Sequence, residues 1–181
     1  MEFLSDLWMP IVVSAAFVWV ASAIMHMVMP HHKTEWAGVP DEGKLNDALA
    51  GIEPGMYMFP FGTMADMKKP EFIEKMKKGP NGVLTIWPGP TNMGRNLVLM
   101  LVFNLVVGVF VAYVGSHTID AGWEYLAIFR VIGAMAFMAY GFGWIPNMVW
   151  FGGKGFWAYT FDALVYALLT AGTFGWLWPA A

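Results

Sequence analysis

The chain has 181 residues, of which 58 % are hydrophobic and 13 % are charged, and its mean hydropathy is +0.54. Soluble domains carry about 25 % charged residues, so this composition excludes an ordinary water-facing surface. The formal net charge of −3 argues against a nucleic-acid partner, because such a partner requires a basic face. The absence of cysteine excludes disulfides, thiolate metal sites and cysteine nucleophiles. The length predicts one membrane domain over residues 1–181.

Four segments are long and apolar enough to cross a bilayer, which requires about 20 mostly apolar residues. They cover residues 7–29, 97–115, 125–150 and 156–178. The acidic start of the chain lacks the basic region of a cleaved signal peptide, so the first segment is predicted to remain as a helix. The sequence therefore predicts an all-α integral membrane protein with a bundle of four transmembrane helices.

The distribution of lysine and arginine predicts the orientation of this bundle. Nine of the ten basic residues lie between residues 33 and 95 or in the short loop between the last two segments. Because cytoplasmic loops are enriched in lysine and arginine, this side is predicted to be cytoplasmic and both termini periplasmic. Tryptophans near the segment ends are typical of the two membrane interfaces.

Residues 30–94 are predicted to form an ordered cytoplasmic cap. Eight of the eleven prolines lie here and prevent a long helix, while several aromatic residues argue against disorder. A short helix is expected after Asp41, which can cap it. Residues 56–61 and 83–87 are two extended runs that can pair as a small β-hairpin.

A second short helix is predicted over residues 70–79 of the cap. Proline opens it, acidic residues precede basic ones, and Gly-Pro ends it. Phe72, Ile73 and Met76 are spaced to form one apolar face, and lysines outnumber glutamates around it. Two arrangements are open: the helix lies on the inner leaflet, or it is solvated and Phe72 packs on the cap itself.

Five runs are spread over most of the chain: His31-His32-Lys33, Val39-Pro40-Asp41-Glu42, residues 56–60, residues 71–80 and residues 169–179. Together they resemble a family of small uncharacterised bacterial inner-membrane proteins with four transmembrane helices. The resemblance implies a bacterial source and a location in the inner (cytoplasmic) membrane. It brings no activity, substrate or catalytic residue with it.

Small residues predict where the helices pack, because close approach of backbones stabilises helix pairs in lipid. The fourth segment carries a packing stripe at four-residue spacing: Ala163, Ala167, Ala171 and Gly175. The second segment has a similar stripe: Asn104, Gly108, Ala112 and Ser116. The first segment offers Ala15, Ser22 and His26 on one side. We expect these stripes to face one another.

A small set of polar side chains falls inside the predicted membrane segments: His26, Asn104, Arg130, Asp162, Tyr166 and Thr170. A carboxylate at the depth of Asp162 is unfavourable without a partner. By depth, His26 is the nearest candidate and Asn104 the second. Arg130 lies towards the opposite leaflet, where it is expected to snorkel outward or to meet Asp6 or Glu124.

Methionine and histidine gather at the end of the first segment, where Met25, His26, Met29, His31 and His32 are candidate metal ligands. Thioether and imidazole groups suit Cu(I). Two features argue against a metal site here. His26 points away from the helix face that carries Met25 and Met29, and Pro30 breaks the helix before His31. Haem is excluded, since His26 and His117 lie at opposite membrane faces. No metal and no cofactor is therefore predicted.

The sequence contains no GxSxG, HExxH, Walker or GxGxxG motif, so no enzymatic activity is predicted. A hydrolytic or metal cluster of His31 and His32 with Asp41 and Glu42 is the remaining catalytic alternative. The favoured hypothesis is a non-catalytic accessory or structural subunit of a larger bacterial membrane complex, respiratory or photosynthetic. Its expected partners are the lipid bilayer and other membrane subunits or further copies of itself.

Two alternatives to the accessory subunit stay open. One is a small transporter or proton pathway along the polar stripe of the fourth segment, formed by Asp162, Tyr166, Thr170 and Thr173. The other is copper binding at the methionine–histidine run.

Overall fold

The computed structural model describes residues 2–120 and 122–179, and the chain divides into two compact units. The first unit comprises residues 1–36 and 92–181, and the second comprises residues 37–91. Where one domain with a cap over residues 30–94 was expected, the cap forms a unit of its own. Its boundaries lie inside the predicted ones because residues 30–36 pack with the helices of the first unit.

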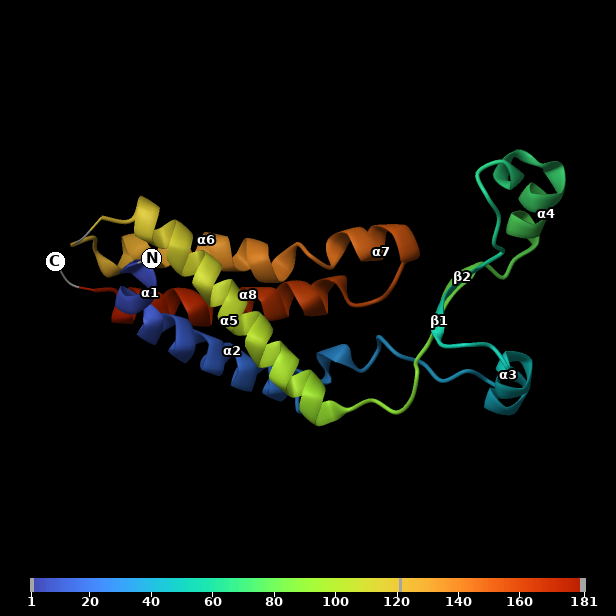
Figure 1. The fold of residues 1–181 in the computed structure, drawn as a ribbon, viewed down its shortest axis with the longest axis horizontal. Coiled ribbons are helices and arrows are strands. Elements are labelled where there is room, and N and C mark those ends of the chain that lie inside the picture. Colours follow the sequence, from blue (N-terminus) through green and yellow to red (C-terminus); the bar gives the residue numbers. More distant parts are fainter. Residues whose placement is uncertain (1, 121, 180–181) are drawn as a thin grey trace. The chain divides into compact units, whose positions relative to one another are not determined.

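The first unit is helical, and its elements are α1 (Glu2–Asp6), α2 (Trp8–Met27), η1 (Pro30–His32), α5 (Met93–Thr118), α6 (Tyr125–Gly141), α7 (Ile145–Phe151) and α8 (Phe156–Leu177). Four helical segments are long and apolar enough to cross a membrane: Trp8–Met27, Met93–Thr118, Tyr125–Phe151 and Phe156–Leu177. The prediction of four such segments is confirmed. Successive long helices run in opposite directions, with α8 packed against both α2 and α6 (Figure 1).

The third long segment is broken, which differs from the continuous helix expected over residues 125–150. Helix α6 ends at Gly141 and α7 begins at Ile145. Pro146 lies in the first turn of α7 and has no amide hydrogen to donate to the preceding turn. Gly141 and Gly143 on either side of Phe142 lower the helix propensity further, so the chain re-forms a helix only after Trp144.

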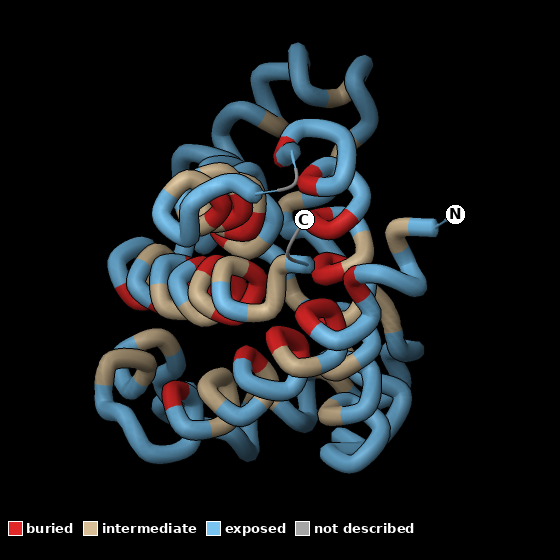
Figure 2. The backbone as a smooth tube through the Cα atoms, turned by 90° about the vertical axis from the view of Figure 1, so that its left-hand side faces the viewer, coloured by how far each residue is buried: buried red, intermediate tan, exposed pale blue. Residues whose placement is uncertain are grey.

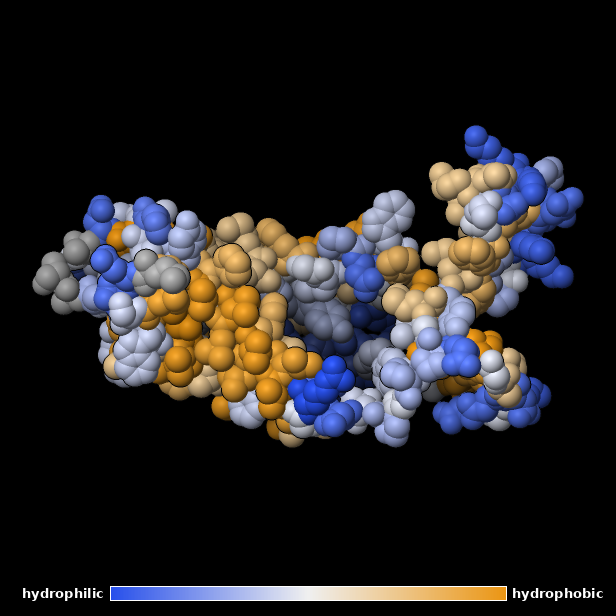
Figure 3. All heavy atoms as spheres, in the orientation of Figure 1, coloured by the Kyte–Doolittle hydropathy of each residue, from blue (hydrophilic) through white to orange (hydrophobic). Residues whose placement is uncertain are grey.

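Large apolar side chains are exposed on the outside of the bundle, while its mainly apolar interior also holds a few polar side chains. The buried polar residues are Ser14, Asn104, Asp162, Thr170 and Thr173, whereas Phe17, Phe110, Leu164 and Leu168 are among the exposed apolar ones. Buried positions gather where the helices meet (Figure 2), and hydrophobic residues cover much of the outer face of the long helices (Figure 3). An apolar outer face differs from the surface of a water-soluble bundle and suits a lipid environment.

The small residues of α8 pack against α6. A methyl group at Gly133 of α6 would lie 3.3 Å from the Ala171 methyl, and one at Gly141 would lie 3.4 Å from that of Ala163. The stripe of α5 contacts α2 instead, because a methyl group at Gly108 would lie 3.2 Å from the Ile11 side chain. The expectation that the stripes of the second and fourth segments face each other is therefore wrong.

The second unit contains α3 (Glu42–Leu49), β1 (Gly55–Phe59), η2 (Asp66–Lys68), α4 (Pro70–Lys78) and β2 (Gly82–Ile86). The two strands pair antiparallel with Tyr57 opposite Leu84, as the extended runs predicted. The connection between them carries η2 and α4 rather than a tight turn. Asp41 caps α3 by accepting a hydrogen bond from the Lys44 amide at 3.0 Å, and this interaction lowers the pKa of Asp41.

The adjacent residues Ala15 and Ala16 of α2 provide a test of this packing, because Ala15 is buried and Ala16 is exposed. Ala15→Leu should destabilise the bundle by about 1–3 kcal/mol, since overpacking forces neighbouring side chains out of place. Ala16→Leu adds the same group on the outer surface and should leave the stability unchanged. Thermal unfolding of the two variants in detergent measures the difference, and equal melting temperatures would contradict the helix arrangement.

Candidate functional site

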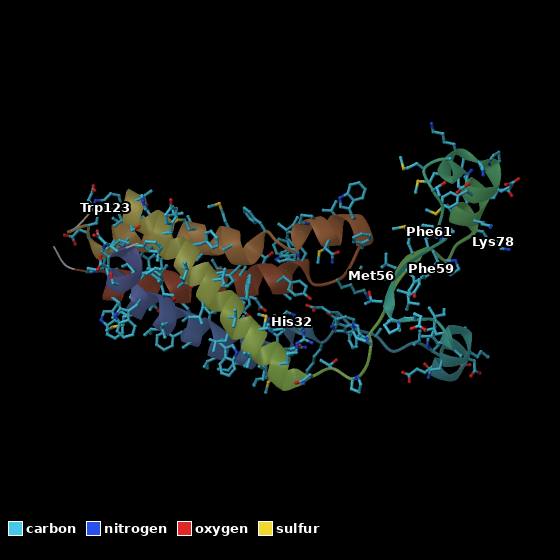
Figure 4. The ribbon with its side chains drawn as sticks, in the orientation of Figure 1. His32, Met56, Phe59, Phe61, Lys78 and Trp123 are labelled. Carbon is cyan, nitrogen blue, oxygen red and sulfur yellow. The ribbon has the colours of Figure 1, made fainter. Side chains whose placement is uncertain are left out.

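The candidate site lies at the end of the bundle where α2 stops and α8 begins. Met29 is extended, and Pro30 then starts η1, which carries His31 and His32 back towards α8. Figure 4 labels His32 at this end of the bundle. Pro30 breaks the helix, and this break was expected to prevent His26 and His31 from sharing a site. In the structure the same turn brings them together with Asp162.

Asp162 is buried, with an exposed fraction of 3 %, and both of its oxygens have histidine partners. His31 Nε2 lies 2.7 Å from Oδ1, and His32 Nε2 lies 2.8 Å from Oδ2. His26 Nδ1 is 3.8 Å from Oδ2, and the Tyr166 hydroxyl donates to the same oxygen at 3.4 Å. The carboxylate therefore has the partners that its burial requires.

The two partners expected for Asp162 have different positions in the structure. His26 is close to the carboxylate but lies beyond hydrogen-bond distance, so its role is secondary to that of His31 and His32. Asn104 is buried in α5, and its side-chain amide has no hydrogen-bond partner within the described residues. The expected Asp162–Asn104 pair is therefore absent from the described part of the chain.

His32 links two carboxylates, since its Nδ1 lies 2.5 Å from Glu35 Oε1 while its Nε2 contacts Asp162. Ionised carboxylates only accept hydrogen bonds, so both contacts are satisfied when His32 is an imidazolium. Burial alone would lower the pKa of His32. The hydrogen bonds to Asp162 and Glu35, together with their negative charges, outweigh burial and raise this pKa above its ordinary value.

Glu35 is itself held in place by the start of α8. The Tyr159 hydroxyl donates to Glu35 Oε2 at 2.9 Å. Gly155 precedes α8 with a φ of +121°, and a methyl group there would lie 2.7 Å from Glu35 Oε1. A glycine is thus required here both for its conformation and for the close approach of Glu35. Gly155 is the last residue of the glycine-rich run over residues 152–155, and this residue contacts the Glu35 side chain of the site.

Sequence reasoning missed Glu35 and Tyr159. The available signal was the spacing of Glu35, which follows His32 by three residues and so falls on the same side of a helical turn. Nothing in the sequence connects Tyr159 with either residue. The carboxylates beside His31 and His32 are Asp162 and Glu35, whereas Asp41 of the proposed catalytic cluster caps α3 in the second unit.

Three residues have ligand atoms close enough to share a metal ion. One atom each from His26, His32 and Asp162 lies within 4.8 Å of the others. Ligands of a tetrahedral zinc ion with bonds of about 2.1 Å are separated by about 3.4 Å, so the three atoms would have to move up to about 1.4 Å closer together to hold such an ion. The His26 and His32 rings stack with centroids 4.3 Å apart. The His26 side chain is 51 % exposed, so the group is open to solvent on that side.

The two methionine candidates lie outside this group. Met25 is buried and packs with Val18 and Tyr166 in the core between α2 and α8. Met29 is exposed and precedes η1. His31 contacts the other oxygen of Asp162, and its Nδ1 is buried without a hydrogen-bond partner among the described residues. The ligand group therefore offers nitrogen and oxygen, not sulfur.

The remaining polar residues do not extend the site. The hydroxyl of Thr170 donates to the Tyr166 carbonyl, and that of Thr173 donates to the Leu169 carbonyl, each at 2.8 Å. Both of these bonds go to backbone carbonyls of α8, so the link between side chains of the polar stripe is the one from Tyr166 to Asp162. Arg130 is exposed on α6, and within residues 2–120 and 122–179 it forms no ion pair with Asp6 or Glu124.

Comparison of the chain with protein-family models, with curated proteins and with solved structures finds no match. The resemblance to small bacterial inner-membrane proteins accordingly stays a prediction. The geometry of the histidine–carboxylate cluster carries the functional argument alone.

Two substitutions at Asp162 test the cluster. Asp162→Leu leaves His31, His32 and Tyr166 without their acceptor and should lower the free energy of unfolding by about 3–5 kcal/mol. Asp162→Asn keeps one acceptor oxygen, so its effect should be smaller, about 1–3 kcal/mol. Thermal unfolding at one pH ranks the variants, with the exposed Asp6→Asn as control. Equal stability of the Leu and Asn variants would exclude the network.

Proposed function

We propose that this chain is a multi-pass bacterial inner-membrane protein that binds a divalent transition-metal ion between His26, His32 and Asp162. The observation that carries the proposal is the convergence of three ligand atoms within 4.8 Å, from residues that the chain brings together from α2, η1 and α8. Ionisable residues that gather within an apolar helix bundle often mark a functional site.

The contacts around His32 support this proposal. Metal-bound histidines usually donate their second ring nitrogen to a carboxylate, which fixes the ring and strengthens it as a ligand. Glu35 is placed for this role at His32 Nδ1, and Tyr159 holds Glu35 in turn. A metal ion on Nε2 would take the place of the proton that now lies between His32 and Asp162.

The donor set favours a borderline divalent ion such as Zn²⁺ over Cu(I). Imidazole and carboxylate ligands suit zinc, iron and manganese, whereas Cu(I) prefers sulfur. The sulfur-bearing Met25 packs in the helix core instead of joining the group. Three protein ligands would leave a fourth tetrahedral position, which water or a small-molecule ligand could fill from the exposed side of His26.

The proposed membrane topology places this metal site at the cytoplasmic end of the bundle. Lysine-rich residues 33–95 follow the site in sequence, and the positive-inside rule puts them in the cytoplasm. The apolar outer face of the first unit supports membrane insertion. Both termini are then periplasmic.

The hypothesis of an accessory subunit has less support than the metal site. It was based on the small-residue faces, which would let a partner helix approach. Ala163 and Ala171 are instead packed against glycines of α6, so this face is used within the chain. The proton-pathway hypothesis is weakened in the same way, because Thr170 and Thr173 bond to their own helix.

Metal binding is tested by titrating the purified, chelator-stripped protein with Zn²⁺ and by following Co²⁺ binding through its visible absorption. We expect about one ion per chain, with three protein ligands. His32→Ala and Asp162→Ala should weaken binding by more than 100-fold. Glu35→Gln should weaken it by about 10–100-fold, because it alters only the residue that orients His32.

His117→Ala is the matched control, since His117 is exposed at the opposite end of α5 and should not affect the affinity. Wild-type protein that binds no ion, or a His32→Ala variant that binds as tightly as wild type, would overturn the proposal.

The topology has its own test, which the absence of natural cysteine makes simple. Asp47→Cys and Asp120→Cys place single thiols at exposed positions in the second unit and between α5 and α6. A membrane-impermeant thiol reagent should label position 120 in intact cells and position 47 only after lysis. Labelling of both positions from outside would contradict the orientation.

A further inference from the structure

We propose that helix α4 of the second unit docks on the anionic lipid surface of the membrane through a face centred on Ile73 and Met76. This proposal rests on the membrane insertion proposed above, but not on the metal site. It names one partner, a bilayer with acidic headgroups, and follows from the exposure and charge pattern of α4.

The apolar face of α4 is exposed. Ile73 is 41 % exposed and Met76 is 42 % exposed, whereas Phe72 is partly buried. A methyl group at Gly62 would lie 2.6 Å from the Phe72 ring, so Phe72 packs on the loop before η2. The two arrangements predicted for this helix are thus compatible. Phe72 fixes α4 to its own unit, and its neighbours Ile73 and Met76 stay uncovered.

Charged residues surround this face. With 3.6 residues per turn, successive residues are rotated by about 100°, so Lys77 lies about 40° from Ile73 and borders the face. Lys75 and Glu74 each lie about 130° from the middle of the face, on opposite sides, and Glu71 and Lys78 lie nearly opposite it. An apolar strip that has a lysine at its edge and no acidic residue equally near is complementary to an anionic headgroup layer over an acyl core.

The surrounding segment has the same character. Lys69 pairs with Asp66 at 2.6 Å, which leaves Lys68, Lys75, Lys77 and Lys78 against the two glutamates of the helix. Phe61 and Met64, in the loop that leads to η2, are each 80 % exposed. Figure 4 shows Lys78 at the end of α4, and Figure 3 shows hydrophilic and hydrophobic residues side by side on this unit.

The second unit is joined to long helices at both of its ends. It begins at Ala37, ten residues after the end of α2 at Met27, and it ends at Thr91, directly before α5 begins at Met93. If α2 and α5 span the membrane, both ends of this unit are anchored near the same bilayer surface. Such tethering raises the effective concentration of the lipid surface at α4, so even a weak docking face is occupied.

The experiment uses the full chain in lipid nanodiscs, with an environment-sensitive fluorophore on Ile73→Cys and a spin-labelled lipid as quencher. In phosphatidylcholine discs that contain phosphatidylglycerol, we expect strong quenching at low salt. The quenching should fall in pure phosphatidylcholine and at high salt, because the Debye length shrinks from about 10 Å at 0.1 M to about 3 Å at 1 M.

Charge variants test the mechanism. Lys75→Gln with Lys77→Gln should lower the ratio of docked to free α4 by about 30-fold, from about 1 kcal/mol per lysine. Lys44→Gln, on the exposed surface of α3, removes a charge from the same unit and should leave the ratio unchanged.

Two further labels separate the possible failures. A fluorophore on Leu164→Cys, at the exposed apolar face of α8, reports membrane insertion independently of α4. Quenching at Leu164 without quenching at Ile73 would overturn docking while supporting insertion. Quenching of the fluorophore at position 73 that does not change with salt or with lipid charge would also overturn the proposal. So would a fluorophore at position 73 that is shielded from solvent by an acidic protein but not by lipid.

Discussion

A carboxylate buried among apolar helices determines how one end of this molecule is built. Asp162 lies within α8, where an unpartnered charge would destabilise the bundle strongly. The chain supplies partners by ending α2 early and turning at Pro30, so that His31 and His32 reach both carboxylate oxygens. The end of α2, the turn of η1 and the start of α8 are therefore joined by a single set of charged hydrogen bonds.

The same constraint links the structural and functional properties of the cluster. His32 is partly buried, and as an imidazolium it can donate one hydrogen bond to Asp162 and one to Glu35. Imidazole and carboxylate groups are also good ligands for a divalent metal ion. Glu35 serves either state, because it accepts from the far nitrogen of His32 whether the near nitrogen carries a proton or a metal. Gly155 leaves the space that Glu35 occupies.

The two units differ in the way they present apolar surface. In the first unit, small residues such as Gly133 and Ala171 let α6 and α8 pack closely, and large apolar side chains face outward over the whole length of the helices. In the second unit, apolar exposure is local and lies beside lysines, as around Ile73 and Met76. A continuous apolar surface fits a hydrocarbon core, whereas a local one with basic flanks fits a headgroup layer.

Four features could be predicted from the amino-acid sequence: the four long apolar segments, the cap at Asp41, the helix over residues 70–79 and the pairing of two extended runs. These features depend on local composition, spacing and capping, which the sequence displays directly. The tertiary structure was needed to show that Ala171 faces α6, that His31 and His32 meet Asp162, and that Glu35 and Tyr159 join them. The contacts of His31, His32 and Glu35 with α8 join residues more than one hundred positions apart. Several small or polar faces also offer equivalent partners. The choice among them is made by how the helices pack together, which no local pattern encodes.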